Sequence, residues 1–423
     1  MSRLWAALVV GLAAVAARAG EPPAELVVPA DQVLKARELV RQLGSPSYQT
    51  REDATAELGR MGRAARGPLL DAVATSTDYE VRSRAARLLP RAEAADLQAR
   101  IAAFVADADG KYDHDLPGWD QFRAHAGTDK ASRALFAEML RTAENRELLA
   151  ALAVSKRDGG HALSNRRTAL LLAQNPTIGG RLGQPAQARQ PTLTDIATVL
   201  FGEVQIPSAD IPRGQVPFGN VTGAAFVQYP ASLQAATNPD ATPHGPAYKR
   251  LLLRWLDTRT SPEDLNQVAN FAQNLAAVRD MTPLLRRVVT TDGVQGTSRG
   301  QAMVLLLQRN KKAEHPFLKA QLKNEVVVNP VFIGGNPAGG APIQANCQIR
   351  DMALALLVAD TGQNIFDYGF ETAQGNTPNP VAQPYPTYAF LTDEARDRGM
   401  RKWAEWEAQH PIPAFDPGPV PKR

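Results

Sequence analysis

Residues 296–300, GTSRG, have the Gly-x-Ser-x-Gly spacing in which a serine can act as a nucleophile. That chemistry needs a buried strand directly before the motif, so that the serine lies on a sharp strand-to-helix turn. The preceding residues, TTDGVQ, are instead typical of a turn, and the chain lacks alternating strand and helix patterns. Because Arg299 also belongs to a repeated helical pattern, we expect Ser298 to lie in the first turn of a helix and not to be catalytic.

A second candidate for chemistry is a group of acidic side chains that could ligate Ca²⁺. An EF-hand loop needs carboxylates at its first, third and fifth positions and glycine at the sixth. With Gly110 as the sixth residue, the first would be Val105, so this loop does not match. A looser calcium site is an alternative, but we favour a solvated hinge over 107–127. The group comprises Asp107, Asp109, Asp113, His114 and Asp115.

The histidines and the single cysteine do not form a pattern typical of a metal site or a redox site. The sequence has no His-Glu-x-x-His or His-x-His pattern, and the single cysteine, Cys347, excludes an intramolecular disulfide and a cysteine-rich zinc site. We therefore expect no metal and no cofactor. The histidines are scattered: His114, His125, His161, His244, His315 and His410.

Basic side chains recur at helical spacing near the N-terminus. They are predicted to form a solvated outer face, with an acidic partner or a surface polysaccharide as the alternative. Binding of DNA along such a stripe is disfavoured, because the chain carries no concentrated basic field. The stripe is Arg84, Arg87 and Arg91, with Arg60, Arg63 and Arg66 near by.

These side chains must be positioned by helices, because the chain repeats a helical pattern. Residues 48–58, YQTREDATAEL, match residues 79–89, YEVRSRAARLL, at a spacing of 31 residues. The shared Arg-x-x-Ala-x-x-x-Leu lies on one stripe of a helix, where the small alanine lets a neighbouring helix approach. Each segment follows another amphipathic helix, at 31–43 and 64–75. The matched positions are Arg51 and Arg82, Ala54 and Ala85, and Leu58 and Leu89.

The same pattern returns twice in the second half, with a weaker match at 166–173. The aromatic residue three positions before each N-terminal arginine, Tyr48 or Tyr79, is expected to pack at a helix start. Cys347 likewise lies three positions before Arg350, and it is expected to be buried at the start of the helix that contains Arg350. The later matches are Arg299, Ala302 and Leu306, and Arg350, Ala353 and Leu357.

Paired helices with this pattern resemble HEAT-like repeats of the short kind named after phycobilisome lyase subunits. The resemblance covers 31–91 well and 284–358 in part, and the closing segment resembles exported bacterial HEAT-repeat proteins. It implies an all-α fold, an α-solenoid of stacked helix pairs whose surfaces bind partners. It carries over no catalytic residue.

The predicted organisation follows from the repeats and the Pro/Gly-rich stretches between them. N-terminal repeats at 31–106, ending in a helix over 96–107, precede the hinge at 107–127 and a helical repeat domain at 128–410. Long loop insertions are expected at 174–247, with a small hairpin over 216–230, and at 324–346. A stripe of Met400, Trp403 and Trp406 is predicted to cap the last helices, with a carbohydrate or peptide platform as the alternative. Residues 411–423 are predicted to form a loose tail.

The first residues have the form of a secretory signal peptide. MSR is basic, the following stretch is apolar, and Ala17-Arg18-Ala19 is typical of cleavage after Ala19. No membrane span and no lipid-attachment cysteine are expected. Loss of residues 1–19 lowers the formal charge from +4 to +2, which gives no support for nucleic-acid binding.

The sequence therefore predicts an exported, soluble protein of the periplasm or extracellular space. The favoured function is a non-enzymatic scaffold or adaptor that binds a partner protein in the cell envelope. The alternatives are an enzyme or chromophore-handling protein of the phycobilin-lyase type, or a carbohydrate-binding protein. The two insertions are the predicted contact regions, since long loops on a rigid scaffold often carry binding.

Overall fold

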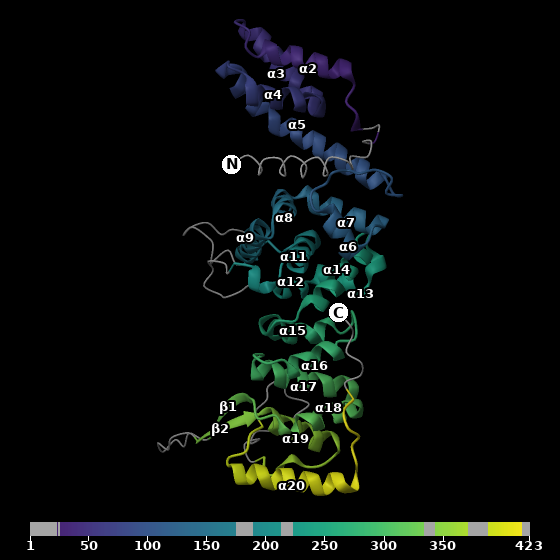
Figure 1. Ribbon diagram of the computed structural model, residues 1–423, viewed down its shortest axis with the longest axis vertical. Coiled ribbons are helices and arrows are strands. Elements are labelled where there is room, and N and C mark those ends of the chain that lie inside the picture. The colour runs from purple at the N-terminus through teal and green to yellow at the C-terminus, as the bar shows by residue number, and fades with distance from the viewer. Residues whose placement is uncertain are drawn as a thin grey trace, which may run out of the picture. The chain divides into compact units, whose positions relative to one another are not determined.

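The computed structural model describes residue 23 and residues 26–174, 189–212, 223–333, 343–370 and 388–416. These residues are mostly helical, which confirms the all-α class (Figure 1). They fall into two compact units: the first is drawn from 1–162 and 239–251, and the second from 163–238 and 252–423. The predicted signal peptide lies outside the described residues, and the predicted hinge lies within the first unit.

The first unit begins with helices whose starts are set by side-chain caps. The hydroxyl of Ser47 accepts a hydrogen bond from Thr50 N–H, and the carboxylate of Asp78 accepts one from Glu80 N–H at 2.8 Å. The helices are α2 (Ala30–Gln42), α3 (Tyr48–Met61), α4 (Arg66–Thr75), α5 (Tyr79–Ala106), α6 (Trp119–Ala126), α7 (Lys130–Arg141) and α8 (Ala143–Val154), with 3-10 turns η3 (Gly62–Ala65) and η5 (Pro239–Ala241).

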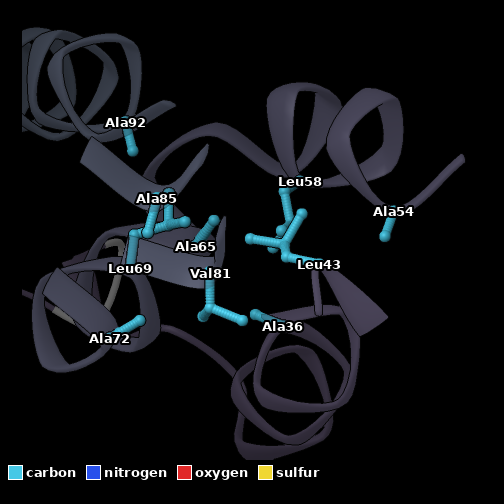
Figure 2. Packing of buried hydrophobic residues seen from close by; sticks show 10 residues of the cluster. All are labelled: Ala36, Leu43, Ala54, Leu58, Ala65, Leu69, Ala72, Val81, Ala85 and Ala92. Atoms are coloured by element: carbon cyan, nitrogen blue, oxygen red, sulfur yellow. The ribbon is translucent and has the colours of Figure 1, made fainter. Parts of the chain in front are cut away.

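Helices α2 to α5 enclose a core of small and branched side chains (Figure 2). The pattern alanines Ala54 and Ala85 are fully buried, and Leu58 is 1% exposed, whereas Leu89 is partly buried. Alanine at the contact lets helices approach closely, and the larger side chains fill the space between them. The cluster consists of Ala36, Leu43, Ala54, Leu58, Ala65, Leu69, Ala72, Val81, Ala85 and Ala92.

Helices α3 and α5 run parallel along α3, because contacts join their first turns and also join the end of α3 to the middle of α5. Near the starts, Arg84 Nη1 lies 2.8 Å from Glu52 Oε1. At Gly62, directly after α3, a β-carbon would lie 3.4 Å from that of Ala95 in the middle of α5. Equivalent positions of the two helices therefore lie side by side.

Helix α5 is longer than predicted. The sequence indicated a break after the second repeat, with a separate helix over 96–107, but α5 is continuous from Tyr79 to Ala106 and contains Pro90. Proline has no N–H to donate within a helix. Pro90 lies at an exposed position of the helix.

The second unit is also helical, and α9 and α14 have residues in both units. Helix α15 starts as the sequence indicates, with the Ser261 side chain accepting from Asp264 N–H and Pro262 in the first turn. The elements are α9 (Lys156–Gln174), α11 (Leu193–Gln205), α12 (Ala224–Val227), α13 (Pro230–Thr237), α14 (Gly245–Thr258), α15 (Pro262–Leu275), α16 (Thr282–Thr290), α17 (Gly296–Asn310), α18 (His315–Ala320), α19 (Ile349–Asp360) and α20 (Asp393–Gln409), with η4 (Ser208–Asp210), η6 (Lys311–Glu314), η7 (Gln321–Lys323) and η8 (Ile365–Tyr368).

The predicted loop at 324–346 contains a β-hairpin instead. Strand β1 (Val327–Ile333) pairs antiparallel with β2 (Ile343–Gln348), with an irregularity between Val327 and Asn329. Pro330 is tolerated because both strands of a two-stranded sheet are edge strands. The hairpin predicted at 216–230 is wrong in its described part, since α12 and the start of α13 lie there; residues 216–222 lie outside the described residues.

The described part of the predicted insertion at 174–247 is mostly helical, with Phe226 fully buried. At the other end, the described part of the predicted tail, 411–416, packs against α18. Phe415 meets Phe317 edge to face at 5.2 Å, and Lys319 Nζ donates to the carbonyl of Ile412 at 2.9 Å. None of the described helices is long and apolar enough to cross a membrane.

Candidate binding surface

The repeat arginines of α3 and α5 fix the turns that precede these helices. Arg51 Nη1 donates to the carbonyl of Ser45 at 2.8 Å, and Arg82 Nη1 donates to the carbonyl of Ser76 at 2.7 Å. These bonds satisfy carbonyls beyond the end of the preceding helix, which have no helical donor. Arg299 acts in the same way, donating from Nε to the carbonyl of Val294 at 3.1 Å.

Two large aromatic side chains next to these arginines are exposed to solvent. Tyr48 is 65% exposed and Tyr79 is 75% exposed. The guanidinium carbon of Arg51 lies 5.7 Å from the Tyr48 ring centroid, and that of Arg82 lies 6.0 Å from the Tyr79 ring centroid. The prediction that both tyrosines pack at a helix start is therefore wrong. We call Tyr48, Arg51, Tyr79 and Arg82 the tyrosine edge.

The tyrosines are exposed because of where a helix directs its first side chain. Side chains point toward the helix N-terminus, so a residue at the first position points past the end of the packed layer. The two turns that carry the tyrosine edge lie against each other: a β-carbon on Gly44 would lie 2.7 Å from Asp78 Oδ2. Both rings therefore project from the same edge of the first unit.

A cleft of about 540 Å³ adjoins the tyrosine edge between α2 and α4. Ser76, whose carbonyl receives Arg82, is one of its lining residues, and the buried Ala72 and Val81 form apolar wall. The cleft also carries two exposed cations, Arg37 and Arg41. The remaining lining residues are Val40, Pro68, Asp71 and Thr75.

The predicted basic stripe is not a continuous solvated face. Arg84 is only 9% exposed and lies between α3 and α5, where Nε is 2.5 Å from Glu80 and Nη1 is 2.8 Å from Glu52. The hydrogen bonds that Arg84 donates to these carboxylates raise the pKa of its guanidinium. Arg60 pairs with Glu57 at 2.7 Å. The stripe thus contributes to packing and local pairing as well as to surface charge.

The serine of the Gly-x-Ser-x-Gly motif lies in the first turn of α17, as expected, and is 5% exposed. Arg299 is 3% exposed, and Ala302 and Leu306 are fully buried in the same helix. In α19, Ala353 and Leu357 are fully buried, whereas Arg350 Nη1 pairs with Glu325 at 2.8 Å.

Asp107 forms hydrogen bonds with several later residues of the acidic segment that follows α5. Its carboxylate accepts from the N–H groups of Lys111 and Tyr112 and from His114 Nε2, all within 3.0 Å. Burial alone would raise the pKa of Asp107, but these bonds and the charge of Arg133 lower it to about 2. Within the described ranges, no group of three or more His, Cys, Asp or Glu side chains is arranged to hold a metal ion.

The second unit contains a buried ion network that the sequence did not indicate. Glu203, with a fully buried carboxylate, lies 2.5 Å from Arg167 Nη2 and accepts from Trp255 Nε1 at 2.6 Å. Arg259 Nη1 contacts Glu203 at 3.3 Å and Asp264 at 3.0 Å. Two arginines thus balance two carboxylates, and the network ties α9, α11, α14 and α15 together.

A second buried pair joins α20 to α19. Arg396 holds both carboxylate oxygens of Asp351, at 2.7 Å and 3.2 Å. Burial raises the pKa of Asp351, and the bonds from Arg396 act in the opposite direction. Cys347 lies next to this pair and is fully buried, as predicted. Burial raises the pKa of its thiol far above the usual range.

The predicted aromatic stripe of α20 is used mainly for packing. Trp403 is 2% exposed, and Trp406 stacks on it with ring centroids 5.0 Å apart. The ring of His410 stacks on Trp406 at 4.4 Å. These stacked contacts leave no open aromatic platform at Trp403.

Comparisons with protein-family models, curated proteins and solved structures return no match for this chain.

Proposed function

We propose that this chain is an exported, non-enzymatic scaffold of the cell envelope that binds a partner protein at the tyrosine edge. The observation that carries the proposal is the exposure of Tyr48 and Tyr79 at equivalent positions of neighbouring helices. Packing does not require these rings, since the core beneath them is closed by smaller side chains. Tyrosine and arginine are enriched among the residues that dominate the energy of protein interfaces.

The tyrosine edge is also held in place before a partner arrives. Each ring lies over its own arginine, and Nη1 of each arginine is anchored to a turn carbonyl. A side chain that is already ordered loses less conformational entropy on binding, so more of the contact energy contributes to affinity. This arrangement supports recognition of a partner by a rigid surface.

The wider architecture in this proposal is a HEAT-like α-solenoid. Support comes from the parallel α3 and α5, from the shared Arg-x-x-Ala-x-x-x-Leu pattern, and from the role of its arginine in holding the turn before the helix. Export is proposed from the basic and apolar residues at 1–19. A solenoid suits an adaptor because its repeats present equivalent side chains along one edge.

Native mass spectrometry of the protein purified gently from its own cells tests this proposal. We expect a co-purifying protein at fixed stoichiometry, and we expect its loss in the Tyr48→Ala/Tyr79→Ala double variant. Tyr112→Ala is the matched control, because Tyr112 is also exposed in the first unit but lies outside the tyrosine edge. A bound small molecule in place of a protein, or partner capture that is unchanged in the double variant, would overturn the proposal.

A further inference from the structure

We infer that a surface of α16 and α18 binds an extended segment of a partner protein, with an aliphatic residue and a phenylalanine three positions later. We call this surface the strap site and define it by Arg286, Phe317 and Lys319. The chain's own residues 411–416 occupy it as a strap, which the partner segment displaces. The inference goes beyond the proposed function, because the strap and its site belong to the second unit and include no residue of the tyrosine edge.

The strap itself shows which ligand the site accepts. Residues 411–416 turn back from the end of α20 and pass along α18 (Figure 1). Ile412 is 9% exposed and Phe415 is half-buried, whereas Pro411 and the two residues between the anchors are exposed. Contact therefore recurs after three residues, which is the repeat of an extended polyproline II segment. The site thus holds two apolar side chains at this spacing.

The phenylalanine of the strap packs against an aromatic ring and a guanidinium group. The Phe415 ring meets the buried ring of Phe317 edge to face, with centroids 5.2 Å apart. The guanidinium carbon of Arg286 lies 5.2 Å from the Phe415 centroid and 5.7 Å from the Phe317 centroid. Two hydrogen bonds to Glu314, at 2.9 Å and 3.0 Å, orient this guanidinium independently of the strap. A ring edge and a cation held in this way favour an aromatic side chain in the ligand.

Lys319 adds a contact to the backbone of the ligand. Its Nζ donates to the carbonyl of Ile412 at 2.9 Å and also pairs with Glu407 near the end of α20. A bond to a carbonyl does not depend on the side chain of the ligand residue, so a partner segment in the same extended form can accept it. Lys319 therefore positions the ligand backbone, and the two apolar contacts select the residue types.

Few interactions hold the strap closed. Among the described residues, no backbone–backbone hydrogen bond involves 411–415. Segments with few buried apolar contacts and no backbone pairing open at a low cost in free energy. A tethered segment nevertheless competes at a millimolar effective concentration, and it lowers the apparent affinity of another ligand by the fraction of chains that are open. Weakening the strap should therefore raise the apparent affinity of the site.

Fluorescence anisotropy tests the inference on full mature chains, with a labelled peptide of the sequence of residues 411–416, Pro-Ile-Pro-Ala-Phe-Asp. The open-strap variant, Ile412→Ala/Phe415→Ala, should bind this peptide saturably at millimolar concentration. The wild type should bind it at least about tenfold more weakly, because its own strap competes. The peptide Pro-Ile-Phe-Pro-Ala-Asp has the same composition without the three-residue spacing, and its binding to the open-strap variant should be at least about tenfold weaker.

A substitution in the site separates docking from unspecific binding. In the open-strap variant, Lys319→Ala should weaken peptide binding about fivefold, because the ligand carbonyl loses its donor. Lys323→Ala is the matched control, since Lys323 is an exposed lysine in η7, directly after α18, and should leave binding unchanged. Unchanged thermal melting of these variants would show that altered binding is not due to unfolding.

Each contrary outcome overturns a stated part of the inference. Equal binding to the wild type and the open-strap variant means that the strap does not cover the site, and no saturable binding to the variant means that the site does not exist. Equal binding of the two peptides means that the spacing is not recognised. A wild-type dimer in native mass spectrometry that is lost in the open-strap variant would assign the site to the strap of a second copy and not to a partner. None of these measurements involves Tyr48 or Tyr79, so the scaffold proposal is tested separately.

Discussion

The first turn of α17 lies directly against the backbone of β1, because Gly296 leaves room for Val327. A β-carbon on Gly296 would lie 2.1 Å from the carbonyl oxygen of Val327 and 2.4 Å from the α-carbon of Val328. Both neighbours are backbone atoms, which cannot move away as a flexible side chain can. The glycine at this position is therefore explained by close approach of the hairpin.

We predict that Gly296→Ala destabilises the second unit by about 2 to 3 kcal/mol, because the added methyl group displaces β1 from α17. Gly59→Ala is the matched control. Gly59 lies inside helix α3, and a β-carbon there would meet only the Arg91 side chain, at 3.6 Å, so alanine should stabilise the protein by about 0.5 to 1 kcal/mol. Urea denaturation followed by circular dichroism measures both changes. Equal effects of the two substitutions would contradict the close-approach explanation.

The helices were predictable from the sequence, and the hairpin was not. Arg-x-x-Ala-x-x-x-Leu is a helical pattern whose alanine and leucine lie on the buried face, so its period alone indicates α3, α17 and α19. The hairpin was missed because Pro330 and the glycines of 334–340 have the composition of a loop, and only pairing with β2 and packing on α17 reveal the strand.

The exposed tyrosines were misplaced for a different reason. Tyr48 and Tyr79 share a position in the repeat, and a shared position was interpreted as a packing requirement. At the first residue of a helix, the side chain projects past the layer, so a repeated position there can instead be a repeated surface feature. The sequence signal was present in the repeat itself, since each tyrosine lies three residues before its arginine.

We predict that Glu203→Gln destabilises the protein by about 3 to 5 kcal/mol. The substitution leaves Arg167 and Arg259 buried with Asp264 as the remaining carboxylate of the network, and an uncompensated buried charge is strongly unfavourable. Glu138→Gln is the control, because Glu138 pairs with Arg141 on the surface; we expect a change within about 0.5 kcal/mol. If urea denaturation shows a similar loss in the free energy of unfolding for both variants, burial of the network does not increase its contribution to stability.

This network was also beyond reach of the sequence. The partners of Glu203 are separated from it by 36 residues at Arg167 and by 56 at Arg259. Local periodicity reports which face of a helix is apolar, but it does not report which charged residues meet inside the fold. In the sequence, Glu203 looks like an ordinary surface glutamate near the end of α11. Only the folded structure shows that it lies opposite two arginines.

We predict that Cys347 is inert in the folded protein. Its side chain is fully buried, and burial raises the pKa of the thiol, so that the reactive thiolate is scarce at neutral pH. Reaction with an aromatic disulfide reagent at pH 8 should be at least about a hundredfold slower in native protein than in guanidinium chloride. Rapid native labelling would mean that strand β2, which contains Cys347, opens readily.

We predict a pH-dependent contribution of Asp107 to stability. Its pKa is about 2 in the folded protein, below the ordinary 3.8, so the folded state binds fewer protons there than the unfolded state. The stabilisation is therefore fully present above about pH 4 and is lost as the pH falls toward 2. Asp107→Asn should lower the free energy of unfolding by at most about 2 kcal/mol at pH 7, and the difference from the wild type should shrink between pH 4 and 2.5.

Urea denaturation of both proteins at pH 7, 4, 3 and 2.5 measures this difference directly. Asp120→Asn is the control, because Asp120 lies on the surface of α6 with its side chain 77% exposed; it should match the wild type at every pH. If the Asp107→Asn difference stays constant down to pH 2.5, the carboxylate is not held by the N–H groups of Lys111 and Tyr112 in solution. A difference that closes as the wild-type Asp107 is protonated would show that this carboxylate fastens the segment after α5.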